Sequence, residues 1–345
     1  AYLKRVRCPF LFLSSTNDFN APMEFVEKGM ALINQEKKRT VYAAHLNHRF
    51  TPETEFSRVL WLDAHLKGKL RFPRTPQIQI KLEKGQDPEV IVKPDSSREI
   101  GHVDIYYGYG RDPRNRFWAD GKAKSPVDSS KQVWTAKAPL FDLNEPLFVL
   151  ANIYYRLNED EKRETDPTEF VLSVADVRYP QELKKALVKS SSIRETLIDD
   201  FSRGWHDWYA LNENNPHHWL FSTRKFADPR WQFPGSSRIE FEVLTTHPDN
   251  ILGIQIRTNQ WQHYLGKQFE TWTAFVEVNN PGKRKILLSP SDFQNQQGDK
   301  MKDWQGITEF IFCPGNKTDS RQSKNLPPWQ GKRPVFNNLR WNVDQ

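Results

Sequence analysis

Two residues near the start of the 345-residue chain, Asp18 and His48, are of the types that acid–base chemistry needs. A carboxylate that accepts a hydrogen bond from an imidazole fixes the tautomer of the ring and stabilises its protonated form. An imidazole held in this way can take the proton of a serine hydroxyl group, which makes the serine a nucleophile. The pair has this meaning only if the surrounding elements bring the two side chains together.

The elements around the pair read as alternating strands and helices. The apolar run Pro9–Ser15 predicts a buried strand, and the turn residues after it place Asp18 in a loop. Thr40–Ala44 predicts a second strand, and His48 lies in the loop that follows it. Apolar residues at helical spacing predict two helices, at 23–35 and 52–67.

This order is typical of the last part of an α/β-hydrolase fold. Parallel strands place the loops at their carboxyl ends side by side, so Asp18 and His48 can meet across about 30 positions of sequence. In this fold the nucleophile, the acid and the histidine follow one another along the chain, and here the acid precedes the histidine. His45 is an alternative base, but His48 lies deeper in the loop and leads into a helix.

The nucleophile is missing from the sequence. The chain contains no Gly-x-Ser-x-Gly motif, and two parallel strands alone do not make a sheet. We therefore expect residues 1–71 to be the C-terminal portion of a hydrolase domain whose nucleophile and oxyanion hole precede Ala1. Taken alone, this chain is expected to be inactive as a serine esterase.

The rest of the sequence favours two antiparallel β-sandwich domains. From Gln77 the apolar period changes to two, and short strands separated by turns predict a fibronectin or immunoglobulin-like sandwich over residues 72–190. Residues 195–313 alternate in the same way and predict a jelly roll of the galactose-binding type. Residues 314–345, rich in Asn, Lys, Pro and Gln, predict a polar surface tail.

Composition and charge limit the kinds of binding partner that are expected for this chain. The net charge is +7, but Lys and Arg are scattered and form no basic block, so nucleic acid is not an expected partner. No apolar run reaches the roughly 18 residues of a membrane helix, so no membrane insertion is expected. Two cysteines, Cys8 and Cys313, do not make a disulfide framework.

The second sandwich is rich in tryptophan, which suggests either a core or a sugar-binding surface. Sugar C–H groups pack on flat aromatic faces, but burial is the commoner use of an indole. Trp261, in the polar run Asn259–His263, is the best candidate for an exposed, substrate-binding ring.

Metal binding has little support in the spacing of potential ligands. His206, Asp207, His217 and His218 match no zinc pattern, so no metal site is predicted there. If a cation is bound, loop carboxylates near Asp199, Asp200 or Asp228 favour a structural calcium ion.

With these residues laid out, the chain resembles the C-terminal part of bacterial acetylxylan-esterase-like or dienelactone-hydrolase-like proteins. It is also similar to the PhoPQ-activated pathogenicity-related family, in which a fibronectin-type domain follows the hydrolase. The matching stretches lie at 10–22, 47–49, 103–107, 116–118, 223–225 and 228–231. The resemblance implies that Asp18 and His48 are the acid and base of a Ser-His-Asp triad.

Three functions follow as hypotheses. The first is a secreted or periplasmic serine-type carboxylic-ester hydrolase that deacylates polysaccharide or a small ester, without a cofactor. The second is a carbohydrate-binding or scaffolding β-sandwich module. The third is a hydrolase-like protein that is catalytically dead.

Overall fold

The computed structural model of the chain describes residues 2–68, 70–125, 132–161, 167–211, 215–278 and 280–343. It is mostly β-sheet, with four sheets and three α-helices among the described residues. It divides into two compact units, Ala1–Ser191 and Ser192–Gln345, which are described separately. None of the described helices has the length and apolar character needed to span a membrane.

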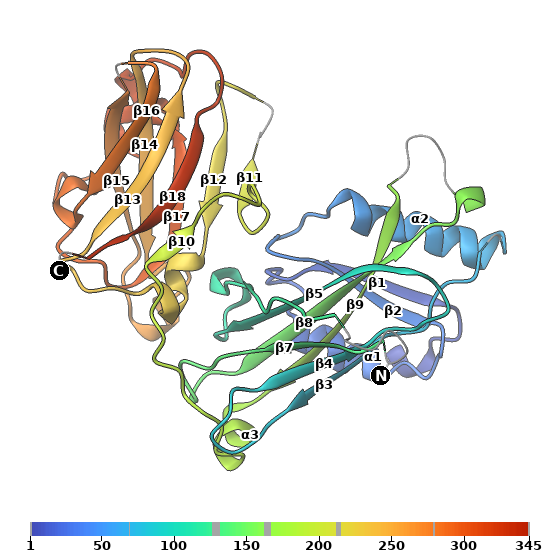
Figure 1. Cartoon of the computed structure of the whole chain (residues 1–345). Coiled ribbons are helices and arrows are strands. Elements are labelled where there is room, and N and C mark those ends of the chain that lie inside the picture. Colours follow the sequence, from blue (N-terminus) through green and yellow to red (C-terminus); the bar gives the residue numbers. More distant parts are fainter. Residues whose placement is uncertain are drawn as a thin grey trace. The chain divides into compact units, whose positions relative to one another are not determined.

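The first unit is built on a six-stranded sheet in the order β1-β2-β9-β8-β5-β6, with a three-stranded sheet, β3-β4-β7, beside it (Figure 1). Its helices are α1 (Met23–Ala31), α2 (Pro52–Leu66) and α3 (Pro180–Lys185). Its strands are β1 (Phe10–Ser15), β2 (Lys38–Ala43), β3 (Gln77–Lys81), β4 (Glu89–Lys93), β5 (Ile100–Tyr109), β6 (Ala119–Asp120), β7 (Trp134–Lys137), β8 (Leu147–Arg156) and β9 (Glu169–Arg178).

Strands β1 and β2 are parallel and in register from Phe10↔Lys38 to Ser15↔Ala43. Helix α1 connects them, as a parallel pair requires. The remaining pairings of the six-stranded sheet are antiparallel. Strands β3 to β9 therefore form a sandwich of three and four antiparallel strands, and β1 and β2 extend its larger sheet.

The joint between β2 and β9 is made largely by side chains. Only one residue pair, Thr40↔Ser173, is in register, and the Thr40 hydroxyl donates to the Ser173 carbonyl at 2.9 Å. The Ser173 hydroxyl accepts from the Tyr42 N–H at 2.8 Å and donates to Asn152 Oδ1 at 2.6 Å. The Asn152 amide donates to the Tyr42 carbonyl at 3.1 Å. We call these four buried residues the seam.

The seam explains why the structure does not divide at the predicted boundary between residues 71 and 72. The two segments share one sheet, so they form one compact unit. Helix α1 also packs on residues from both segments, because Tyr42 lies in the same apolar cluster as strand residues from β5, β8 and β9. That cluster contains Met23, Val26, Met30, Ile33, Tyr42, Tyr106, Trp118, Phe148, Leu150 and Ala175.

Helix α2 begins at a capping box, in which the Thr51 hydroxyl accepts from the Thr54 N–H. The Ser57 hydroxyl of this helix donates to the Val171 carbonyl in β9 and accepts from the Val171 N–H. These two hydrogen bonds anchor the helix to the sheet. The apolar residues of this helix are only partly buried. Phe56, Leu60 and Trp61 are buried, whereas Val59, Leu62 and Leu66 are exposed.

The second unit is an antiparallel sandwich of two sheets, with orders β10-β18-β13-β16 and β11-β12-β17-β14-β15. Its strands are β10 (Leu197–Asp199), β11 (Tyr209–Leu211), β12 (Leu220–Thr223), β13 (Arg238–Thr245), β14 (Asn250–Thr258), β15 (Glu270–Val278), β16 (Gly282–Leu288), β17 (Ile307–Pro314) and β18 (Val335–Asn342). Aromatic rings fill the space between the sheets. For example, Phe241 of β13 and Phe336 of β18 both contact Phe312 of β17.

The structure differs from the prediction of a polar surface tail after residue 313. Strand β18 lies inside its sheet, between β10 and β13, and buries Phe336, Leu339 and Trp341. A register shift interrupts the strand where Asn338 takes a left-handed backbone, with φ 52°. This bulge breaks the alternation of apolar residues by which a strand is recognised in sequence.

Removing the Ser173 hydroxyl tests the seam. A Ser173→Ala variant leaves the Tyr42 N–H and the Asn152 amide oxygen buried without this partner, at a cost of about 1–3 kcal/mol for each group. We expect the free energy of unfolding, measured by urea denaturation, to fall by roughly 2–6 kcal/mol. Ser97→Ala, which removes an exposed turn contact to Asp95, is the control and should change it by less than about 0.5 kcal/mol. An equal loss of stability in the two variants would show that the hydrogen bonds of the seam do not stabilise the first unit.

Candidate functional site

The structure brings Asp18 and His48 together. Nδ1 of the imidazole lies 3.2 Å from Oδ2 of the carboxylate. Each residue follows one of the two parallel strands, Asp18 after β1 and His48 after β2, so the shared carboxyl edge of the strands places the loops side by side. The Asp18 side chain is 12% exposed and the His48 side chain is 47% exposed, so the imidazole forms the open side of the pair.

The carboxylate is oriented by the backbone of its own loop. Its second oxygen, Oδ1, accepts hydrogen bonds from the N–H groups of Asn20 at 2.8 Å and Ala21 at 3.3 Å. The Asp18 N–H itself donates to the Ser15 carbonyl at 3.1 Å, which closes the turn at the end of β1. These bonds leave Oδ2 directed at the imidazole.

The two histidines of the second loop have different surroundings. Both have left-handed backbones, with φ 62° at His45 and 52° at His48. The ring of His45 is buried and packs against Tyr106 and Phe117 of the sandwich. The imidazole beside Asp18 is therefore that of His48, and His45 contributes to packing under the loop.

A loop of the sandwich holds the acid loop in place. The buried Asn17 side chain donates from Nδ2 to the carbonyls of Pro113 at 2.6 Å and Arg116 at 2.7 Å. Thr16, next to it, accepts from the His45 N–H at 2.8 Å through its hydroxyl. The acid loop, the histidine loop and the loop at 113–116 are thus tied together by two neighbouring residues.

The outer face of the imidazole is also lined. Asn20 Nδ2 lies 2.8 Å from His48 Nε2, and the ring of Phe19 meets the imidazole edge-on at 5.4 Å between centroids. The guanidinium of Arg114 lies 5.2 Å from the Phe19 ring and forms a bidentate pair with Asp112. Neither Asn17 nor Asn20 is singled out by sequence pattern, because asparagine is common in any turn.

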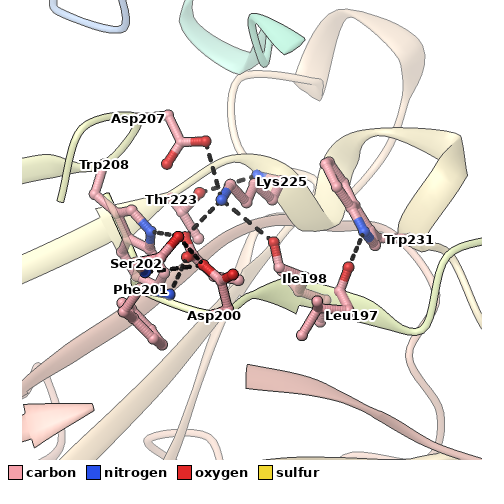
Figure 2. Close-up of polar contacts among 11 residues, drawn as sticks. Leu197, Ile198, Asp200, Phe201, Ser202, Asp207, Trp208, Thr223, Lys225 and Trp231 are labelled. Carbon is pink, nitrogen blue, oxygen red and sulfur yellow. Dashed lines mark hydrogen bonds and ion pairs between the residues drawn. The ribbon is translucent and has the colours of Figure 1, made fainter. Parts of the chain in front are cut away.

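A second charged cluster lies in the other unit, around the buried ammonium of Lys225 (Figure 2). Its Nζ contacts Asp199 Oδ2 at 2.6 Å, Asp207 Oδ2 at 3.0 Å and the carbonyl of Ile198 at 3.3 Å. The indole N–H of Trp208 donates to the same oxygen of Asp199 at 2.7 Å. Lysine thus supplies the positive charge in a ring of oxygens that would suit a cation.

This cluster bears on the calcium expectation. The Asp199 carboxylate faces an ammonium, and Asp200 accepts hydrogen bonds from Ser202 in an exposed turn. Asp228 is buried, caps a short 3-10 helix by accepting from the Arg230 N–H, and has a pKa raised by burial. The three acids therefore have separate local partners.

Two of the residues considered as zinc ligands, His217 and Asp207, also have different partners. His217 Nδ1 lies 2.7 Å from the carbonyl of Trp329, while Asp207 pairs with Lys225. Within the described parts of the chain, no group of three or more His, Cys, Asp or Glu side chains is placed to hold a metal ion.

Trp261 is exposed, as its polar neighbours suggested, with 40% of its surface accessible. It lies in the loop between β14 and β15, and three other large side chains of that loop are also exposed: Tyr264 (57%), Leu265 (58%) and Phe269 (50%). By contrast, Trp208, Trp219, Trp231, Trp304, Trp329 and Trp341 are buried. The aromatic loop, residues 259–269, thus presents three exposed aromatic rings to solvent.

The Lys225 cluster is expected to stabilise the second unit. Lys225→Met removes the ammonium and leaves two carboxylates facing each other, and breaking a buried pair in this way costs about 3–5 kcal/mol. Lys285→Met is the matched control, because Lys285 is exposed and its partner Glu240 keeps Arg340; it should cost about 1 kcal/mol or less. Urea denaturation measures both. A Lys225→Met variant as stable as the control would show that the cluster does not stabilise the fold.

Comparisons with known proteins give little beyond this geometry. No family model matches the sequence, and no curated protein sequence matches it at a significant level. Among solved structures, the N-terminal CBM22-1-CBM22-2 tandem domain of Xyn10C from Paenibacillus barcinonensis is similar with a TM-score of 0.25 and 11% sequence identity. The alignment covers 79% of this chain and 93% of that chain. A similarity this weak adds nothing to the fold and the site as the structure of this chain shows them.

Proposed function

We propose that Asp18 and His48 are the acid and base of a serine-type carboxylic-ester hydrolase. The observation that carries the proposal is the 3.2 Å contact between His48 Nδ1 and Asp18 Oδ2 at the carboxyl ends of two parallel strands. On this proposal residues 1–71 are the C-terminal part of an α/β-hydrolase fold, and residues 72–190 are a fibronectin-like sandwich joined to it through the seam.

In this proposal the nucleophile is supplied by polypeptide beyond these 345 residues. Two features of the first unit support an additional parallel strand and its helices. Strand β1 is the outer strand of the six-stranded sheet as described, so its outer backbone edge is available for pairing. In addition, Val59, Leu62 and Leu66 form an exposed apolar strip on α2 that further polypeptide would cover.

The reaction would follow the usual course for this pair. His48 Nε2 takes the proton of the serine hydroxyl while the oxygen attacks the ester carbonyl, and Asp18 stabilises the imidazolium. The ring then gives the proton to the departing alcohol, which leaves an acyl-enzyme. A water molecule, deprotonated by the same imidazole, releases the acid. Acylated polysaccharide is the expected substrate class.

Loss of the base tests this function. In the full-length protein, His48→Ala should lower the hydrolysis rate of p-nitrophenyl acetate by about 10⁴-fold or more, and Asp18→Asn by about 10⁴-fold, because the ring loses its required tautomer. His102→Ala, at an exposed histidine of the same unit, should leave the rate unchanged. Full activity in His48→Ala would refute the assignment, and an inactive full-length parent would favour the catalytically dead alternative.

A second candidate function, carbohydrate binding by the second unit, is favoured by the aromatic loop. Trp261, Tyr264 and Phe269 offer exposed rings on which sugar C–H groups can pack. Between them lie Gln262 and Gln268, whose side-chain amides can both donate to and accept from hydroxyl groups. On this proposal residues 195–313 and strand β18 form a galactose-binding-like jelly roll.

The loop is held in a defined shape, which suits a binding surface. The Asn259 N–H donates to the Gly306 carbonyl at 2.8 Å, and the Asn259 side chain donates to the Gln268 carbonyl at 3.1 Å. Gly306 has a left-handed backbone, with φ 72°, and a Cβ there would lie 2.6 Å from Asn259 Oδ1, so a larger residue would strain this turn. A fixed loop loses little conformational entropy when a ligand binds.

Binding to immobilised polysaccharides tests the second candidate. Trp261→Ala should weaken binding by roughly tenfold, the effect of losing one aromatic packing contact. Phe25→Ala, which removes another exposed ring, on α1 of the first unit, is the control and should not change affinity. If the wild-type chain binds none of an array of polysaccharides, this function is ruled out.

A further inference from the structure

Asn20 contacts both members of the acid–imidazole pair. Its backbone N–H donates to Asp18 Oδ1 at 2.8 Å, and its side-chain Nδ2 lies 2.8 Å from His48 Nε2. The two contacts involve the carboxylate oxygen and the ring nitrogen that do not face each other, because Asp18 and His48 meet through Oδ2 and Nδ1. Asn20 therefore closes a chain of hydrogen bonds that runs from the carboxylate through the imidazole to a carboxamide.

This arrangement selects one tautomer of the ring. Because His48 Nδ1 faces a carboxylate, which only accepts hydrogen bonds, Nδ1 carries the proton. In the neutral ring Nε2 is then an acceptor, and the Nδ2 group of Asn20 can donate to it. The tautomer that results is the one a general base needs, with the lone pair of Nε2 on the outer side.

That lone pair is also the one that a hydroxyl nucleophile must reach, since the base takes its proton there. We propose that Asn20 is a placeholder for the nucleophile: its carboxamide occupies the position beside Nε2 that the serine hydroxyl takes when the proposed hydrolytic site is complete. This inference rests on the function proposed for Asp18 and His48 and assigns their neighbour a role in it. Asn20 caps the base until the hydroxyl displaces the amide.

The chemistry of the carboxamide suits such an exchange. Asn20 and His48 are both exposed, so the displaced amide can bond to water, and the net cost of breaking the contact is that of one ordinary hydrogen bond. If the ring becomes protonated, the amide can turn and accept from the Nε2 proton through Oδ1. Asn20 can thus partner either charge state of the imidazole, which an alanine at this position could not do.

Acylation of His48 by diethyl pyrocarbonate tests the capping role in this chain without a nucleophile, because the reagent modifies an unprotonated imidazole nitrogen. Site-specific rates at pH 7 come from peptide mapping by mass spectrometry. Asn20→Ala should raise the rate at His48 about fivefold, the factor expected for one lost hydrogen bond. Asn20→Asp should lower the rate, because a carboxylate beside Nε2 keeps that nitrogen protonated.

His102 and His218, both exposed and in different units, are internal controls. The acylation rate of each should be the same in the variants as in the wild type. The proposal is overturned if Asn20→Ala does not speed acylation of His48, or if Asn20→Asp reacts as fast as Asn20→Ala. These outcomes are separate from the esterase test. Full activity in His48→Ala would refute the hydrolase while leaving the acylation result intact, and unchanged acylation would refute the capping role alone.

Discussion

The first unit depends on one buried network of hydrogen bonds, which joins the Ser173 hydroxyl, the Asn152 amide and the backbone of Tyr42. Strand β2 has only one residue in register with β9, so the backbone ladder alone would be a weak joint. The side chains complete it and satisfy polar groups that are buried from solvent on both sides. Because of this joint, the strands that precede the acid and histidine loops are part of the same sheet as the sandwich.

The sequence predicted what depends on local pattern. The apolar run before Asp18, the helix at 52–67 and the parallel connection through α1 are all readable within a few tens of residues, and together they place His48 beside Asp18. The contacts of Asn17 with Pro113 and Arg116 join residues 96 and 99 positions apart, and no spacing rule reports such a contact. Strand β18 escaped notice because its bulge at Asn338 breaks the period of two.

The second unit shows how a side chain can do the work expected of a bound ion. The acidic residues around Asp199 suggested calcium, because several oxygens in one loop need a positive charge. Lys225 provides that charge from within the chain. The same oxygen of Asp199 also accepts from the Trp208 indole N–H, and the other oxygen accepts from the Phe201 N–H. Sequence composition reveals the acids but not which cation neutralises them, since Lys225 is 26 positions from Asp199.

The distance in sequence between the two sides of the seam has a consequence for the order of assembly during synthesis. Thr40 and Ser173 are 133 positions apart, so strand β2 emerges from the ribosome long before its partner strand exists. At translation rates of about 5–20 residues per second this interval lasts roughly 7–27 s. During that time β2 lacks its joint to β9, and the acid loop lacks the hydrogen bonds from Asn17 to the loop at 113–116 until that loop too has been synthesised.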